Sequence, residues 1–186
     1  MPNWVYNSLT IEGNAEDISA LKTQLNQPFQ RQHDQWNPKT GEMELQDVLY
    51  PNPVFAFWNI IKPTNLEAYN KQADHTLPME QQLLFKGENW YDWNVTNWGT
   101  KWDVAVSHSE EYPETELMEE SETSLAYRFN TAWSPPIPAI EKLSEQYPKL
   151  HFNLSYEEET GWGGSMEFLR GKITAESEYN WKCWSC

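Results

Sequence analysis

Several residue types that other protein classes depend on are scarce in this sequence. Only 2 of its 186 residues are cysteines, so the chain has no disulfide framework and no complete four-cysteine zinc site. Lys and Arg number 13 against 28 Asp and Glu, a net charge of −15. This balance argues against binding to nucleic acid or to anionic membranes, because both depend on clustered basic side chains. No apolar run approaches the roughly 18 residues that span a membrane.

Motifs for catalysis and cofactor binding are also absent. The chain has no phosphate loop, dinucleotide fingerprint or Gly-x-Ser-x-Gly elbow. Its four histidines do not stand at the spacing of metal ligands. The N-terminal segment lacks the basic and apolar regions of a secretory signal. We therefore expect a cytoplasmic protein with no cofactor and no metal, and we favour a non-enzymatic function.

The residues that are present indicate a folded chain. Hydrophobic residues make up 39% of the sequence and aromatic residues 15%, which is too apolar for a disordered protein. The length suits one domain with a core of its own. We therefore expect residues 1–186 to form a single domain.

Periodicity predicts an alternation of strands and helices. Residues 4–11 alternate as a strand, and Asn14 is placed to cap a helix from Ala15. Further strands are predicted over 55–61, 101–107, 125–131, 151–157 and 165–176, with a helix over 137–147. The order β-α-β followed by β-β-α-β-β predicts a ferredoxin-like α+β sandwich with a mostly antiparallel sheet and helices on one face.

Four segments lie outside this pattern. Residues 28–53 are predicted to form a surface insertion with a short helix over 43–49, and residues 79–103 a Trp-rich segment with a helix over 79–86. Residues 109–123 are predicted to form a solvated acidic loop, and residues 177–186 a tail after a turn at 161–164. We expect the helical insertion and its tryptophans to cover the second face of the sheet.

Three clusters of residues resemble a known family. They are residues 1–11 (MPNWVYNSLTI), residues 97–103 (NWGTKWD), and residues 131–136 (TAWSPP) with 143–148 (LSEQYP). Together they resemble the YubB ferredoxin-like family of phages and plasmids, which includes Api-type phage proteins. The resemblance implies a ferredoxin-like fold in a small cytoplasmic protein of a mobile element. That family usually has Cys where Val5 stands here, and the resemblance implies no catalytic residues.

Tryptophan is the most conspicuous residue, with 11 copies. The rings could fill the core or form a surface that stacks on a partner or ligand. A nucleotide would need basic neighbours, and only Lys86 and Lys101 stand near the cluster in sequence, with Arg128 and Arg170 available if the strands bring them close. The candidate binding residues are Trp90, Trp93, Trp98, Trp102 and Trp133.

The acidic segment supplies a second group of candidate residues. Glu116, Glu119 and Glu120 could form an acidic surface that binds a basic groove on another protein. A run of this kind is also typical of a simply solvated loop. We therefore expect a host-protein partner with a basic surface, and no direct contact with nucleic acid or membrane.

Three functions remain open at this point. The first is a non-enzymatic acidic protein of a phage or mobile element that inhibits a host factor, such as a defence protein. The second is a protein that sequesters a small molecule, such as a nucleotide signal, on the tryptophans. The third is a small acid–base enzyme that uses Pro2 or the carboxylates of Glu157 and Glu159.

The terminal cysteines leave their own alternatives open. Cys183 and Cys186 could be an incidental pair, a reversible disulfide, or half of a metal site shared between two chains.

Overall fold

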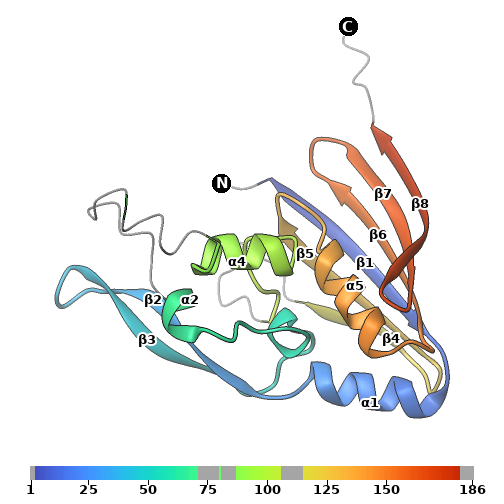
Figure 1. The fold of residues 1–186 in the computed structure, drawn as a ribbon, viewed down its shortest axis with the longest axis horizontal. Helices are drawn as coiled ribbons and strands as arrows, with labels where there is room; N and C mark the ends of the chain where they lie inside the picture. Colours follow the sequence, from blue (N-terminus) through green and yellow to red (C-terminus); the bar gives the residue numbers. More distant parts are fainter. Residues whose placement is uncertain (1–2, 71–79, 81–86, 106–114, 181–186) are drawn as a thin grey trace, which may run out of the picture.

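A six-stranded antiparallel sheet in the order β4-β5-β1-β6-β7-β8 forms one side of the molecule, and the helices pack against it (Figure 1). The computed structural model describes residues 3–70, 80, 87–105 and 115–180. Strands β4, β5, β1 and β6, with helices α1 and α5, have the chain order and strand order of a ferredoxin-like fold. The predicted ferredoxin-like α+β architecture is therefore confirmed. These elements and the β7–β8 hairpin that extends the sheet are β1 (Trp4–Glu12), α1 (Ala15–Leu25), β4 (Glu116–Glu120), β5 (Ser124–Ala132), α5 (Ile137–Gln146), β6 (His151–Glu158), β7 (Trp162–Leu169) and β8 (Lys172–Asn180).

Strand β1 and helix α1 form as the sequence predicts. Val5, Leu9 and Ile11 point to the helical side of the sheet and are fully buried, because the strand alternates between apolar and polar residues. The Asn14 side chain accepts a hydrogen bond from the backbone N–H of Asp17 and so caps α1. One face of α1 then packs its apolar residues into the core.

The long connection between α1 and β4 is an insertion into the ferredoxin-like pattern. It contains a separate two-stranded sheet of β2 (Phe29–Asn37) and β3 (Glu42–Tyr50), followed by the 3-10 helix η1 (Phe57–Asn59), α2 (Leu66–Asn70) and α4 (Trp90–Asn97). The short helix predicted over 43–49 is wrong, because these residues pair with β2. Gly41, with φ of 72°, closes the turn that joins the two strands.

The strand predicted over 55–61 is also wrong. Residues 55–58 are all buried, with no exposed face, and they form an irregular segment that ends in η1. Phe55 stacks on Phe129 of β5 with 5.2 Å between ring centroids. The run is apolar because core surrounds it on all sides, and periodicity does not separate that arrangement from a buried strand.

Other predicted segments also differ from the structure or lie partly outside the described residues. Residues 101–105 form bends instead of the start of a strand, and residues 106–107 lie outside the described residues. The predicted acidic loop contains edge strand β4, and its residues 109–114 lie outside the description. Residues 165–176 fold as two strands that turn at Arg170 and Gly171, β7 already begins within the predicted turn, and β8 includes residues 177–180 of the predicted tail. The helix predicted over 79–86 lies outside the described residues, apart from Glu80.

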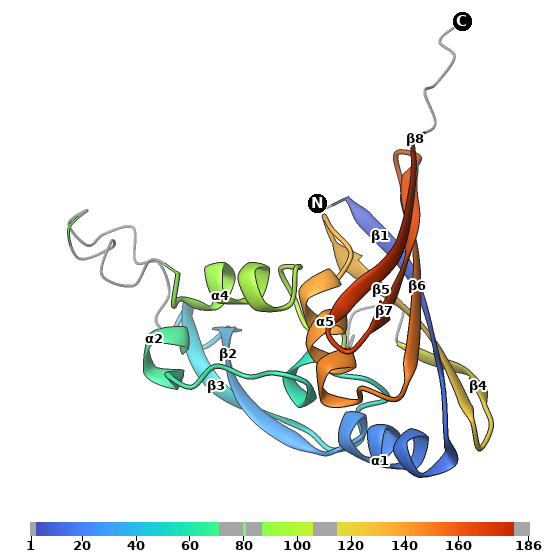
Figure 2. The ribbon, with the colours of Figure 1, turned by 45° about the vertical axis from the view of Figure 1, so that its right-hand side comes forward.

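The insertion packs on the same face of the sheet as the helices. Phe57, Trp58 and Trp98 belong to one hydrophobic cluster with Tyr127 and Phe129 of the sheet. Trp58 and Trp98 therefore cover the helical face of the sheet, contrary to the expectation that the insertion and its tryptophans cover the second face. Figure 2 shows the described helices and the insertion on one side of the sheet and no described helix or strand covering the other. The strands carry polar residues on that second side, so burying it would remove polar groups from water without partners.

None of the described helices is long and apolar enough to cross a membrane.

Candidate functional site: the open face of the sheet

The face of the sheet that points away from the helices is called the open face here. Residues paired across antiparallel strands point to the same side, so the register defines rows of side chains on this face. One row crosses five strands, from β5 to β8. It consists of Arg128, Ser8, Ser155, Ser165 and Ser177.

The serine row forms the floor of a hollow of about 460 Å³. Tyr6 and Tyr179 stand at the two ends of the neighbouring row where it lines the hollow, and their side chains are larger than the serines of the floor. Tyr6 is 51% exposed and Tyr179 43% exposed. A second hollow of about 200 Å³ lies further along the same face, next to Glu12, His151 and Glu167. The open face thus combines exposed aromatic rings, hydroxyl groups and concave surface.

Gly163 sets the position of one of these rings. A Cβ atom at Gly163 would lie 2.6 Å from the Tyr179 hydroxyl oxygen and 2.4 Å from the Tyr156 carbonyl oxygen. Only glycine allows Tyr179 to lie this close to β7. The pairing of β7 with β8 therefore places the Tyr179 ring at the side of the hollow.

Carboxylates outnumber basic groups on the open face. The basic side chains that the register of the described strands places on this face are Arg128 and Lys172. Near-surface charges of one sign attract a partner of the opposite sign over about 8 Å at physiological salt. The exposed glutamates that share this face are Glu12, Glu116, Glu119, Glu157 and Glu167.

The structure separates the three glutamates predicted from the acidic segment. Glu116 pairs with Arg128 across β4 and β5, and Glu119 pairs with Ala126, so both lie on the open face. Glu120 points to the other side, where its carboxylate lies 2.5 Å from the Lys22 ammonium of α1. The backbone pairing brings Glu157 and Glu167 onto the same face as Glu116 and Glu119. Sequence reasoning missed Glu167, whose signal is its alternation with the buried residues Met166 and Phe168.

The five candidate tryptophans also divide into two groups. Trp98 is fully buried, and its indole N–H donates to the Ile61 carbonyl oxygen at 3.0 Å. Trp93 packs edge-on against Trp98 at 5.5 Å between centroids. The structure therefore places Trp98 in the core, with Trp93 packed against it, and Trp98 is not available to a partner.

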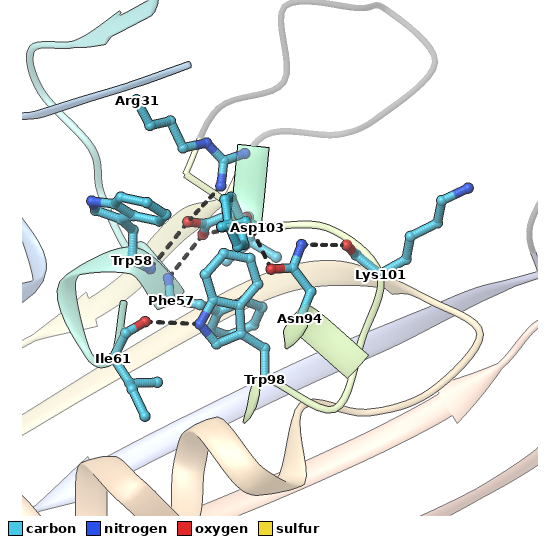
Figure 3. Close-up of polar contacts among 10 residues, drawn as sticks. Arg31, Phe57, Trp58, Ile61, Asn94, Trp98, Lys101 and Asp103 are labelled. Atoms are coloured by element: carbon cyan, nitrogen blue, oxygen red, sulfur yellow. Dashed lines mark hydrogen bonds and ion pairs between the residues drawn. The ribbon is translucent and has the colours of Figure 1, made fainter. Parts of the chain in front are cut away.

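The other three tryptophans surround the Lys101 ammonium. Its Nζ lies 4.4 Å from the ring centroid of Trp102, 5.0 Å from that of Trp133 and 5.9 Å from that of Trp90. Tyr91 contacts Trp133 with 6.3 Å between centroids. Trp90, Tyr91, Lys101, Trp102 and Trp133 are called the aromatic corner below. Asn94 fixes the backbone of this corner by donating to the Lys101 carbonyl oxygen at 2.8 Å (Figure 3).

A buried ion pair lies beneath the insertion (Figure 3). The Asp103 carboxylate accepts hydrogen bonds from the backbone N–H groups of Phe57, Trp58 and Val104, and Arg31 Nη1 lies 3.8 Å away. Burial raises the pKa of Asp103, while Arg31 and the three N–H groups oppose that rise. These contacts join β2, η1 and the segment after α4, so the pair organises the insertion.

A cavity of about 500 Å³ lies beside this ion pair, between β2 and α2. Arg31, Trp58 and Leu66 are among its lining residues.

The residues of the enzymatic alternative are Pro2 and the pair Glu157 and Glu159. Pro2 lies outside the described residues, and Glu157 lies on the open face. Between Glu157 and Glu159, Glu158 is buried and accepts hydrogen bonds from both the backbone N–H and the hydroxyl of Thr160. Burial alone would raise the pKa of Glu158, but hydrogen bonds from Thr160 and Asn3 outweigh it and lower the pKa. A carboxyl group with a lowered pKa is a poor general acid at neutral pH.

The described residues contain no group of three or more His, Cys, Asp or Glu side chains that could hold a metal ion. Cys183 and Cys186 lie outside them.

Comparisons with known proteins agree with this architecture. No curated protein matches the chain. The crystal structure of the protein api92 from Yersinia pseudotuberculosis superposes with a TM-score of 0.55 and 11% identity, over 97% of this chain and 99% of that one. Residues 101–183 match the family model described as the ferredoxin-like domain in Api92-like protein. The chain is therefore similar to api92 in its fold, and its C-terminal part is similar to the ferredoxin-like domain of Api92-like proteins.

Proposed function

We propose that this chain is a non-enzymatic binding protein whose open face binds a basic surface on another protein. One observation carries the proposal: the strand register gathers exposed glutamates on a sheet face that no described element covers. The exposed rings of Tyr6 and Tyr179 supply apolar contact area within the same surface. Interfaces of this kind use aromatic anchors for affinity and complementary charge for partner choice and association rate.

The shape of the face suits a protein partner better than a buried small ligand. The hollow of about 460 Å³ lies on the surface of the sheet, with a floor of serine hydroxyls that both donate and accept hydrogen bonds. A basic side chain of the partner can enter the hollow and lie between the tyrosines, near Glu157. The remaining glutamates then surround the contact as a polar rim.

The resemblance of the sequence to a family of phages and plasmids supports a more specific proposal. We propose that the protein acts in the cytoplasm of a host cell and inhibits a host factor, a defence protein that itself binds nucleic acid through a basic groove. An acidic sheet face occupies such a groove by competing with phosphate groups for the same lysines and arginines.

The alternative of a nucleotide held on the predicted tryptophans is weaker in this arrangement. Trp98 is fully buried, so it cannot stack on a base. Nucleotide phosphates would also be repelled by a chain whose net charge is −15.

Charge reversal on two faces tests the proposal. The open-face variant carries Glu157→Lys and Glu167→Lys, and the matched control carries Glu16→Lys and Glu42→Lys, which are exposed on α1 and β3. Both variants change the net charge by the same amount. We expect the open-face variant to lose the proteins that the tagged parent captures from host lysate at low salt, and the control to retain them.

Three results would contradict this function. Equal loss in both variants would show that overall charge, not the open face, governs capture. Full retention by the open-face variant, or capture that does not change between about 50 mM and 300 mM salt, would remove electrostatic complementarity from the mechanism.

A further inference from the structure

Two sequence motifs that are far apart in the chain, residues 97–103 and residues 131–136, are hydrogen-bonded to each other at the aromatic corner. The Thr100 hydroxyl donates to the Ala132 carbonyl oxygen at 3.0 Å and accepts from the Ala132 N–H at 3.1 Å. The Ser134 hydroxyl donates to the Gly99 carbonyl oxygen at 2.5 Å. A Cβ at Gly99 would lie 2.5 Å from a ring atom of Pro138, so the two segments approach as closely as glycine allows. This clamp fixes the turn after β5, which contains Trp133.

Trp133 has a backbone conformation that disfavours tryptophan. Its φ is 70°, in the left-handed region, and 44% of the residue is exposed. Its N–H donates to the Asn3 carbonyl oxygen at 2.9 Å. A bulky residue persists in this region only where the surroundings impose it, and such residues concentrate at functional sites. A half-exposed ring gains less from burial than a core ring does, so packing alone gives a weak reason for tryptophan here.

The aromatic corner is continuous with the open face. Trp4 precedes Tyr6 by two positions on β1 and therefore points to the same side. Its ring lies 6.1 Å from that of Trp102. The Lys101 ammonium lies 5.0 Å from the ring centroid of Trp133, which places a cation within the range of a cation–π interaction. The corner thus already holds one cation against its rings.

We propose that Trp133 and Tyr91 form an anchoring site for an arginine side chain of the basic partner, an inference that rests on the proposed function. A guanidinium group is flat, stacks on aromatic rings and is more weakly hydrated than an ammonium group. The acidic open face next to the corner attracts the same positively charged surface. A planar anion is disfavoured, because Lys101 supplies a single positive charge whereas the chain as a whole has a net charge of −15.

Indole N–H signals in NMR test the site without the natural partner. The probe is N-acetyl-arginine amide, and its neutral analogue N-acetyl-citrulline amide is the control ligand. We expect a saturable shift of the Trp133 indole signal with the arginine probe and a much smaller shift with the citrulline analogue. No saturable shift with the arginine probe, or equal shifts with both, would overturn the proposal, as would a saturable shift produced by AMP instead.

A matched pair of variants assigns the effect to the ring. Trp133→Gly removes the ring at a φ that suits glycine, and Arg170→Gly makes the same kind of change at the other non-glycine position with positive φ among the described residues, 55°, in the β7–β8 turn. We expect both to remain folded, and Trp133→Gly to unfold at a higher temperature than Trp133→Ala. The perturbation of the remaining corner indoles by the arginine probe should disappear in Trp133→Gly and persist in Arg170→Gly. Persistence in Trp133→Gly would overturn the assignment.

Binding to the captured partner separates this inference from the proposed function. We expect Trp133→Gly to weaken that binding by about 30-fold, the size of a typical hot-spot truncation, and Arg170→Gly to leave it unchanged. If the open-face charge reversal abolishes binding and Trp133→Gly does not weaken it, the anchoring site is wrong and the proposed function stands. If open-face charge reversal has no effect, the proposed function itself fails.

Discussion

The Arg31–Asp103 pair shows how one buried charge determines what its neighbours can do. The Asp103 side chain is 2% exposed and that of Arg31 is 9% exposed. The Arg31 guanidinium carbon lies 5.6 Å from the centroids of both Tyr50 and Trp58. A buried carboxylate is tolerated because its hydrogen bonds and its ion pair oppose the loss of hydration. Removal of either charge therefore lowers stability by more than the long separation of 3.8 Å between Arg31 Nη1 and the Asp103 carboxylate suggests.

The first prediction concerns Arg31→Leu. This change leaves the Asp103 carboxylate buried without a compensating cation, so we expect the free energy of unfolding at neutral pH to fall by about 3–5 kcal/mol. The measurement is urea denaturation, and Arg128→Leu, which removes an exposed arginine from the open face, is the control. We expect less than about 0.5 kcal/mol for the control, and similar losses in both variants would contradict the role assigned to Arg31.

The pH dependence of Arg31→Leu has a defined sign. Burial already raises the pKa of Asp103, and loss of the guanidinium raises it further. A carboxyl group whose pKa is higher in the folded state contributes stability below its unfolded pKa and loses that contribution as pH rises through its folded pKa. The deficit of Arg31→Leu relative to the parent should therefore be largest at neutral pH and shrink toward pH 4. A deficit that does not change with pH would exclude Asp103 as its cause.

At the scale of elements, the β7–β8 hairpin determines the shape of the open face. Strand β8 is exposed along its whole length and pairs with β7 on one side. Its register shifts between Glu167 and Phe168, which places an extra residue, Thr174, on β8. Such bulges increase local twist, and Figure 2 shows β8 curving relative to the centre of the sheet. Tyr179 is held within the hollow by this curvature and by the missing side chain at Gly163.

The second structural prediction is that Gly163→Ala loosens the pairing of β7 with its two neighbours, β6 and β8. The added Cβ would overlap the Tyr156 carbonyl oxygen and the Tyr179 hydroxyl, so we expect a loss of about 1–3 kcal/mol. Hydrogen exchange should quicken in β8 more than in β1 or β5. Ser165→Ala, two residues along the same strand, is the control and should change exchange little. Uniform exchange across all strands in Gly163→Ala would contradict a local effect.

Alternation of apolar and polar residues correctly predicted the elements that have one face in the core and one face in solvent. β1, α1, β5, α5 and β6 have this pattern, and the structure confirms them within a few residues. The segment at Phe55 failed because it is buried on all sides, and β4 failed because an exposed edge strand rich in glutamate has no apolar face to give a period.

The candidate site was partly predictable for a related reason. Composition indicated acidic and aromatic binding residues, and Glu116, Glu119, Trp102 and Trp133 lie at or near exposed surface. The gathering of Glu12, Glu157 and Glu167 with them depends on pairing between strands more than a hundred residues apart, which local pattern does not contain. The burial of Trp98 depends likewise on the path of the insertion.

At the scale of the whole molecule, the range that matches the family model is not a separate structural unit. Residues 101–183 match the ferredoxin-like family model, yet β1 lies between β5 and β6 and pairs with both. The core of the sheet also includes Phe55, Phe57 and Trp98 from the insertion. The residues before the matched range therefore supply both the central strand and much of the apolar cover.

The third structural prediction is that residues 101–183 do not fold alone. Without β1, strands β5 and β6 lose their shared neighbour, and the apolar side of the sheet loses the aromatic cover of the insertion. We expect poor NMR signal dispersion and no cooperative thermal transition for this fragment, in contrast to the full chain. A cooperative transition in the isolated fragment would show that the C-terminal strands pair in another way.

The central position of β1 has a consequence for synthesis in the cell. Val5 pairs with Thr131 on one side and with Glu158 on the other, so β1 requires partners that are synthesised more than a hundred residues after it. At usual elongation rates β1 waits roughly 8–30 s for β6 to be made. During that interval Val5, Leu9 and Ile11 have no sheet to join, which makes the nascent β1 segment a natural substrate for chaperones that bind short apolar segments.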